Sequence, residues 1–153
     1  MKYTTTIYIE LPLEKVIEKF DDPSNMKHWQ PGLLSFEHVS GDPGKPGAVS
    51  RLRYRMGNRD VEMTETIRLR DLPHRFDGSY EANGVLNIVR NRFEALDGSI
   101  TRWTSENEFR FKGIMKLMGL LMPGAFKKQT MRYMQYFKDF AEHDKSIHAI
   151  GKE

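Results

Sequence analysis

The sequence predicts an α+β domain in which one antiparallel sheet of seven strands packs on a long C-terminal helix. Residues 3–10 and 33–111 alternate between apolar and polar side chains, which is typical of half-buried strands. Turn segments at 41–47, 57–58, 72–73, 83–84 and 97–98 divide the second stretch into six strands. From Phe126 onward, apolar residues recur at helical steps. Antiparallel hairpins with a helix on one face make an α+β architecture.

Length and composition indicate one domain. The chain has 153 residues with 39% hydrophobic content, and we expect a domain over residues 1–144 with a polar tail, 145–153. The 24 Lys and Arg are interleaved with 21 Asp and Glu, which is too weak a bias to indicate a nucleic acid partner. Cysteine is absent, so no disulfide or thiolate site can form. No signal-peptide core or membrane span occurs, so we expect a cytoplasmic protein without integral membrane association.

Two short helices are expected between the first and second strands. Residues 13–20 place Val16, Ile17 and Phe20 at helical spacing. The segment 22–24, Asp-Pro-Ser, can cap a second helix that runs to Trp29, where Pro31-Gly32 ends it.

Two turns fix the register of the strands that they join. Two-residue loops at Gly57-Asn58 and Asn83-Gly84 put charged pairs on the outer face of the sheet and mostly apolar pairs on the inner face. The expected outer pairs are Arg55 with Asp60, Arg53 with Glu62 and Asp77 with Arg90. The expected inner pairs are Leu52 with Met63, Tyr54 with Val61 and Tyr80 with Asn87.

The turn at Asp97-Gly98 requires a longer loop. A two-residue loop would set Arg92 opposite Trp103 and mix the two faces. A three-residue loop centred on Gly98, with this glycine in the left-handed conformation, pairs Phe93 with Trp103 inside. The same register gives two outer ion pairs, Arg90 with Glu106 and Glu94 with Arg102.

The longest apolar run, residues 114–142, predicts the C-terminal helix. Its apolar face consists of Phe126, Thr130, Tyr133, Phe137 and Ala141. Three methionines, Met115, Met118 and Met122, are expected to extend this face toward the N-terminus. The proline between them and the rest, residue 123, either restarts the helix at its first turn or kinks it.

Four segments resemble the SRPBCC superfamily, also called START or Bet v 1-like, which includes polyketide cyclase/dehydrase and lipid-transport families. They are residues 22–29 (DPSNMKHW), Leu72-Pro73, residues 97–103 (DGSITRW) and residues 111–115 (FKGIM). The resemblance covers nearly the whole chain. It implies a helix-grip fold, in which a curved seven-stranded antiparallel sheet wraps the C-terminal helix around a cavity for hydrophobic small molecules. No residue set matches a catalytic branch of the superfamily.

A polar row is expected on the inner face. If Ile67 faces Gly78, then Glu65, Tyr80, Asn87 and Phe109 lie side by side across adjacent strands. A buried carboxylate is costly unless it is hydrogen-bonded or protonated, so Glu65 is a structural acid, a ligand anchor or a proton donor. The expected ligand-binding residues are Trp29, Tyr54, Met63, Glu65, Tyr80, Asn87, Asn91, Trp103, Phe109, Met118, Met122, Phe126, Thr130 and Tyr133. Trp29 can equally be a lid that packs on the core.

Three functions are compatible with these residues. The first is binding or carriage of a hydrophobic small molecule, such as a lipid, polyketide or isoprenoid-like compound, without cofactor or metal. The second is a cyclase, dehydratase or hydrolase that uses Glu65 and Tyr80 as acid and base. The third is a protein-interaction module that uses an arginine-rich outer face, which can equally be a solvated face of ion pairs. Its arginines are Arg51, Arg53, Arg55, Arg68, Arg90, Arg92 and Arg102.

Overall fold

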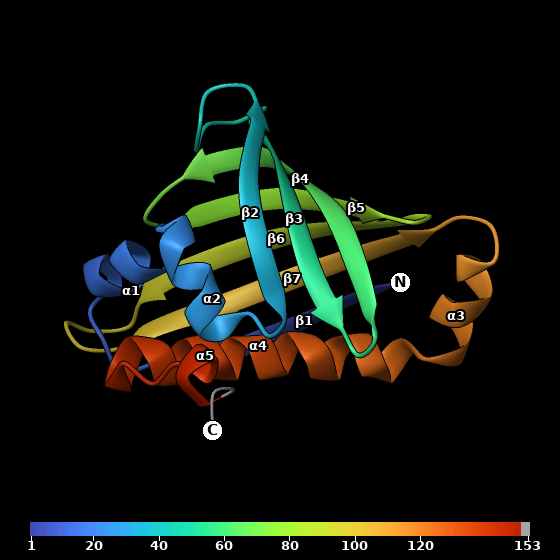
Figure 1. Ribbon diagram of the computed structural model, residues 1–153. Helices are drawn as coiled ribbons and strands as arrows, with labels where there is room; N and C mark the ends of the chain where they lie inside the picture. Colours follow the sequence, from blue (N-terminus) through green and yellow to red (C-terminus); the bar gives the residue numbers. More distant parts are fainter. Residues whose placement is uncertain (151–153) are drawn as a thin grey trace.

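One seven-stranded antiparallel sheet curves around the C-terminal helix of this computed structural model, which describes residues 1–150 except the side chains of Met118, Pro123, Ala149 and Ile150 (Figure 1). The strands are β1 (Lys2–Ile9), β2 (Leu33–Ser40), β3 (Val49–Met56), β4 (Arg59–Asp71), β5 (Arg75–Ala82), β6 (Val85–Ala95) and β7 (Thr101–Phe111). Their order in the sheet is β1-β7-β6-β5-β4-β3-β2. The predicted helix-grip class and strand number are confirmed.

The predicted register is confirmed at all three turns. Arg55 faces Asp60, Tyr80 faces Asn87 and Phe93 faces Trp103. The Leu96 backbone N–H donates a 2.9 Å hydrogen bond to the Ile100 carbonyl oxygen, which closes the predicted three-residue loop, 97–99, but Gly98 does not take the left-handed conformation expected of it. Instead, the Asp97 carboxylate accepts a hydrogen bond of 2.7 Å from the backbone N–H of Ser99, and this contact holds the turn.

The two predicted short helices lie between β1 and β2. They are α1 (Leu13–Phe20) and α2 (Met26–Trp29), joined by the 3-10 turn η1 (Pro23–Asn25). Asp22 caps this turn, because its carboxylate accepts a hydrogen bond of 2.9 Å from the backbone N–H of Ser24.

The C-terminal apolar run forms two helices, α3 (Met115–Leu121) and α4 (Pro123–His143). Pro123 occupies the first turn of α4, so the restart alternative is the correct one. Figure 1 shows α3 turned away from the axis of α4 at the far end of the sheet. The predicted extension of the apolar face is therefore wrong at Met122, which lies at the junction and is 50% exposed.

The predicted polar tail begins with α5 (Ile147–Ile150), and its last residues, 151–153, lie outside the described part of the chain. Beyond the predicted domain boundary at 144, α5 contacts α2. His28 of α2 stacks on Phe140 and shares a 2.7 Å hydrogen bond with the Ser146 hydroxyl. None of the described helices is both long enough and apolar enough to span a bilayer.

The space between sheet and helix has two different halves. Around the C-terminal half of α4, which we call the packed half, aromatic and aliphatic side chains fill the interior. They are Ile7, Ile9, Leu13, Val16, Trp29, Phe93, Trp103, Met134, Phe137, Phe140 and Ala141. Around the N-terminal half of α4, which we call the open half, Phe126, Thr130 and Tyr133 are only half-buried. This helix packs more closely on β1 than on β3, β4 or β5.

Candidate functional site

The predicted polar row is present in the open half. Glu65 of β4 faces Tyr80 of β5, which faces Asn87 of β6, and Phe109 of β7 completes the row. Ser50 of β3 lies on the other side of Glu65. Tyr80 and Asn87 are half-buried, although strands flank them on both sides. Both residues therefore remain partly accessible to solvent.

Burial controls the ionisation of this row. Glu65 is 8% exposed, and desolvation raises its pKa, while the neighbouring Tyr80 hydroxyl partly offsets the rise. Burial and then the Glu65 charge raise the pKa of Tyr80 well above its ordinary value. Tyr54 has a raised pKa because it is buried and lies near Tyr133 and Glu65. Glu65 thus lies near two tyrosines, Tyr80 and Tyr54, whose raised pKa values keep them protonated at neutral pH.

Only some polar atoms near this row have partners. The Tyr54 hydroxyl donates a hydrogen bond of 2.5 Å to the Gln30 side chain. The Tyr133 hydroxyl accepts one of 3.3 Å from the Gln129 amide. By contrast, the side-chain amide oxygen of Asn87, Oδ1, is buried and has no hydrogen-bond donor among the described residues. An unpaired buried acceptor is costly, so Asn87 has an unused capacity to accept a hydrogen bond from a bound molecule.

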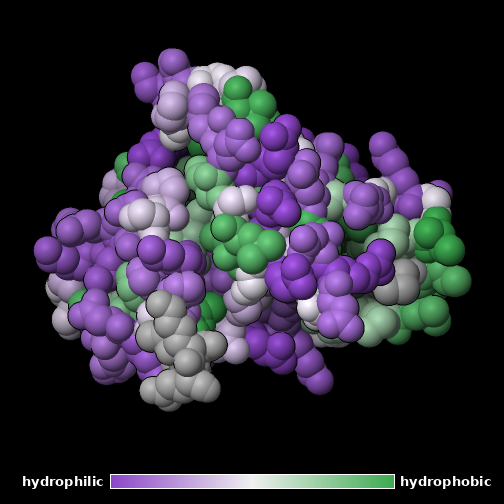
Figure 2. All heavy atoms as spheres, viewed as in Figure 1, coloured by the Kyte–Doolittle hydropathy of each residue, from purple (hydrophilic) through white to green (hydrophobic). Residues whose placement is uncertain are grey.

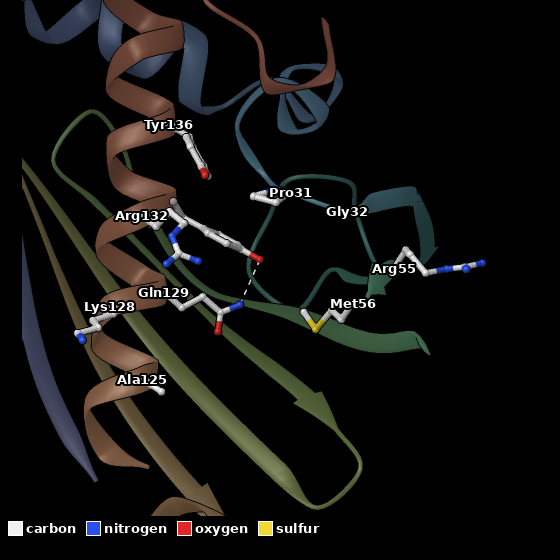
Figure 3. A pocket seen from close by; sticks show the side chains of 10 residues that line it. Pro31, Gly32, Arg55, Met56, Ala125, Lys128, Gln129, Arg132 and Tyr136 are labelled. Carbon is white, nitrogen blue, oxygen red and sulfur yellow. Dashed lines mark hydrogen bonds between the residues drawn. The ribbon is translucent and has the colours of Figure 1, made fainter. Parts of the chain in front are cut away.

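A groove lies between α4 and the β3–β4 hairpin (Figure 3). Its volume is about 480 Å³. It is lined by Pro31, Gly32, Arg55, Met56, Ala125, Lys128, Gln129, Arg132, Tyr133 and Tyr136. Tyr133 lines this groove and lies near Tyr54, which in turn lies near Glu65. The groove therefore lies beside the open half.

The rim of the groove is fixed by a close backbone contact. Gly32 has φ +77°, and the backbone N–H of Arg55 donates a 2.7 Å hydrogen bond to its carbonyl oxygen. A Cβ atom at this position would collide with the Arg55 carbonyl. Only glycine allows the loop before β2 to approach β3 in this way.

A second groove, of about 360 Å³, lies between α3 and the sheet. Its lining residues are Met1, Phe109, Phe111, Lys116, Gly119 and Leu120. Phe109 stacks on Tyr3 and contacts Phe126 at a centroid distance of 4.9 Å. Thr130 shares a 2.6 Å hydrogen bond with the Tyr3 hydroxyl. Phe126 and Thr130 therefore join α4 to β1 and β7.

The structure places three predicted ligand-binding residues in the packed half. Trp29 is 7% exposed and packs on Trp103 and Phe137, so it has the position expected of a core residue. Its indole N–H is buried and has no acceptor within the described residues. The indole of Trp103 donates a 2.9 Å hydrogen bond to Asn91, the third of these residues.

Met63 and Tyr54 lie beside the open half, in a cluster with Met26 and Leu52. The Met118 side chain is not among those that the structure describes.

Sequence reasoning missed most of the groove. Gln129, Arg132 and Tyr136 flank Tyr133 on α4, one step around the helix from the predicted apolar face. Their spacing of three and four residues places them on one face of the helix with Tyr133, and this was the signal that the sequence offered. The sequence marks Pro31-Gly32 as a helix stop, and the family resemblance places a mouth of the cavity next to it.

Six of the seven predicted outer arginines are engaged in ion pairs, whereas Arg68 is exposed and makes none with the described residues. Arg51 contacts Glu37 and Glu62, Arg53 and Arg55 contact Asp60, Arg90 contacts Glu106 and Glu108, Arg92 contacts Asp77, and Arg102 contacts Glu94. The outer face is thus a network of cross-strand pairs. Among the described residues, no group of three or more potential ligands from His, Cys, Asp and Glu could hold a metal ion.

The curved sheet, the long helix and the opening between them define a helix-grip domain. The chain belongs to the family described as polyketide cyclase / dehydrase and lipid transport, whose model matches residues 1–139. This family is part of the SRPBCC superfamily that the sequence resembles. No curated protein matches the sequence.

Several solved structures share the fold. The structure of Ara h 8.0201 is 16% identical with a TM-score of 0.74, over 92% of this chain and 97% of that one. The Zhui aromatase/cyclase from Streptomyces sp. R1128 is 14% identical with a TM-score of 0.76, over 93% of each chain. A conserved protein from Geobacillus kaustophilus is 15% identical with a TM-score of 0.76, over 92% of this chain and 95% of that one. At these identities the similarity shows the fold alone.

Proposed function

We propose that the chain binds or carries an apolar small molecule with one polar end, held in the open half between α4 and the sheet. The observation that supports this most directly is the buried Glu65 near the protonated Tyr54 and Tyr80, together with the groove that Tyr133 lines beside Tyr54. Family membership supports it too, because the family description includes lipid transport.

The polar row suits a neutral oxygen function on the ligand. Burial raises the pKa of Glu65 and so disfavours its charged form, and the protonated Tyr80 hydroxyl can donate a hydrogen bond. Asn87 has a free acceptor. This combination fits a hydroxyl or ketone better than a carboxylate or phosphate. Polyketides, isoprenoid alcohols and neutral lipids carry such groups at the end of an apolar body, and Met56 and Met63 offer an adaptable apolar lining.

The test is a fluorescence titration with the neutral apolar probe N-phenyl-1-naphthylamine. We expect saturable binding by the wild-type protein and weaker binding by Ala125→Trp, because the indole would fill the groove. Ala95→Trp is the matched control, since Ala95 is exposed at the end of β6. Binding must also persist in Leu120→Ser/Leu121→Ser, which removes the exposed leucines of α3. Absence of binding, or equal affinity in all variants, would contradict the proposal.

A second candidate function is acid–base catalysis by Glu65 and Tyr80. The raised pKa of Glu65 favours it, because a carboxyl group that titrates nearer neutrality is a better general acid. This function predicts turnover of a polyketide-like substrate with a bell-shaped pH profile. The profile should disappear in Glu65→Gln while probe affinity is retained. A similar loss of affinity and turnover would instead assign Glu65 to ligand binding.

A further inference from the structure

Helix α3 exposes an unusual amount of apolar surface. The exposed fractions are 82% for Ile114, 60% for Leu117, 81% for Leu120, 70% for Leu121 and 50% for Met122. We call these five residues the α3 patch. Figure 2 shows them as the hydrophobic surface at the end of the molecule where α3 lies in Figure 1. Contiguous exposed apolar side chains of this kind are typical of an interaction surface.

The way α3 is seated explains why its leucines face outward. A Cβ atom on Gly119 would come within 2.9 Å of three atoms of the Phe111 ring, so the helix rests on β7 through this glycine. The Phe111 ring itself stacks on Phe109 at a centroid distance of 5.8 Å, and this contact helps to fix the ring under Gly119. The leucines at 117, 120 and 121 therefore remain at the surface while the helix is held on the sheet.

The charge around the α3 patch is one-sided. Residues 112–138 contain six basic residues and no acidic residue, whereas the rest of the chain has 18 basic and 21 acidic residues. Lys112, Lys116, Lys127 and Lys128 are all exposed. The net positive charge of the protein is thus concentrated in the segment that carries its exposed leucines.

We infer that the α3 patch docks the protein on the surface of an anionic lipid bilayer. Leucine and isoleucine side chains would enter the interface, while the lysines would extend to the charged headgroups. A second copy of the chain is a poorer occupant, because it would bring two positive surfaces together. The inference is independent of the proposed ligand, although the second groove beside Phe109 lies directly under the docking helix.

Vesicle flotation tests this inference. We expect the wild-type protein to float with vesicles of phosphatidylcholine and phosphatidylglycerol, and to float far less with phosphatidylcholine alone. Leu120→Ser/Leu121→Ser should lower the partition coefficient at least about tenfold, because each leucine loses its burial in the bilayer. Lys116→Glu/Lys127→Glu should lower it on anionic vesicles by about fivefold or more per lysine. Leu34→Ser/Leu96→Ser is the control, since both leucines are about half exposed elsewhere.

The depth of insertion gives an independent readout. Trp29 and Trp103 are 7% and 4% exposed, so a tryptophan introduced by Leu120→Trp supplies most of the solvent-sensitive emission. Its emission should shift to shorter wavelength on anionic vesicles. The inference is overturned if wild-type protein does not float with anionic vesicles, or if the α3 and control variants float equally. It is also overturned if α3 variants only abolish self-association, measured by sedimentation without lipid.

Discussion

The contrast between the two halves of the interior can be measured with two phenylalanines of α4. Phe137 is fully buried in the packed half, and its ring centroid lies 5.9, 5.2 and 5.3 Å from those of Phe20, Trp29 and Trp103. Phe126 is half-buried in the open half, with Phe109 and Phe111 as aromatic neighbours. The same substitution at the two positions therefore removes the same atoms from a closed and an open environment.

We expect Phe137→Ala to lower the free energy of unfolding by about 4 to 5 kcal/mol. Deletion of a buried phenylalanine side chain costs about 3 to 5 kcal/mol, and the three aromatic contacts place this site near the upper end. Phe126→Ala should cost about 1 to 2 kcal/mol, because its ring is already partly exposed and no closed cavity forms.

Equilibrium unfolding in urea provides both values. Phe137→Leu, with an expected loss of about 1.5 kcal/mol, keeps the comparison available if the alanine variant does not fold. Probe binding should change in Phe126→Ala and stay unaltered in Phe137→Leu. Equal losses of stability at the two positions would mean that the space between α4 and the sheet is filled uniformly, and would refute the distinction between the halves.

Two further predictions concern Glu65 and the rim of the groove. Because burial raises the folded-state pKa of Glu65 above its ordinary 4.5, the wild-type protein should lose stability as the pH rises from that value through the folded pKa. Glu65→Gln should remove this loss and be more stable than wild type at higher pH; identical urea midpoints across this range would contradict it. Gly32→Ala should cost at least about 2 kcal/mol, from left-handed strain and collision with the Arg55 carbonyl, and should also alter probe affinity. Gly57→Ala, at φ +64° with open space around it, should cost about 1 kcal/mol and leave probe affinity unchanged, and equal effects in both variants would argue against a fixed rim.

The strands and their register could be predicted because their determinants are local. Alternation shows which side chains share a face, and the turn dipeptides fix which residues face each other, as Glu65 and Tyr80 do. The break between α3 and α4 was left open, because a proline is acceptable both at the first turn of a helix and at a kink. Tertiary contacts, such as the seating of Gly119 on Phe111, decide between them.

The site was only partly predictable for a similar reason. Pairing across strands brought Glu65, Tyr80 and Asn87 together, and this follows from register. Whether the interior is filled depends on the summed volumes of side chains from several elements. Trp29 and Trp103 fill one end with the aromatic residues of α1 and α4, and no local pattern indicates which end that is.

The central claim, that an apolar molecule enters the open half of the interior, is tested most directly by NMR of methionine methyl groups labelled with carbon-13. Met56 and Met63 lie beside the open half, whereas Met134 is 1% exposed in the packed half. On titration with the neutral probe N-phenyl-1-naphthylamine, we expect the Met56 and Met63 signals to shift and broaden while the Met134 signal stays in place. Shifts confined to Met115 and Met122 near α3, with Met63 unaffected, would place the probe on the surface and contradict the claim.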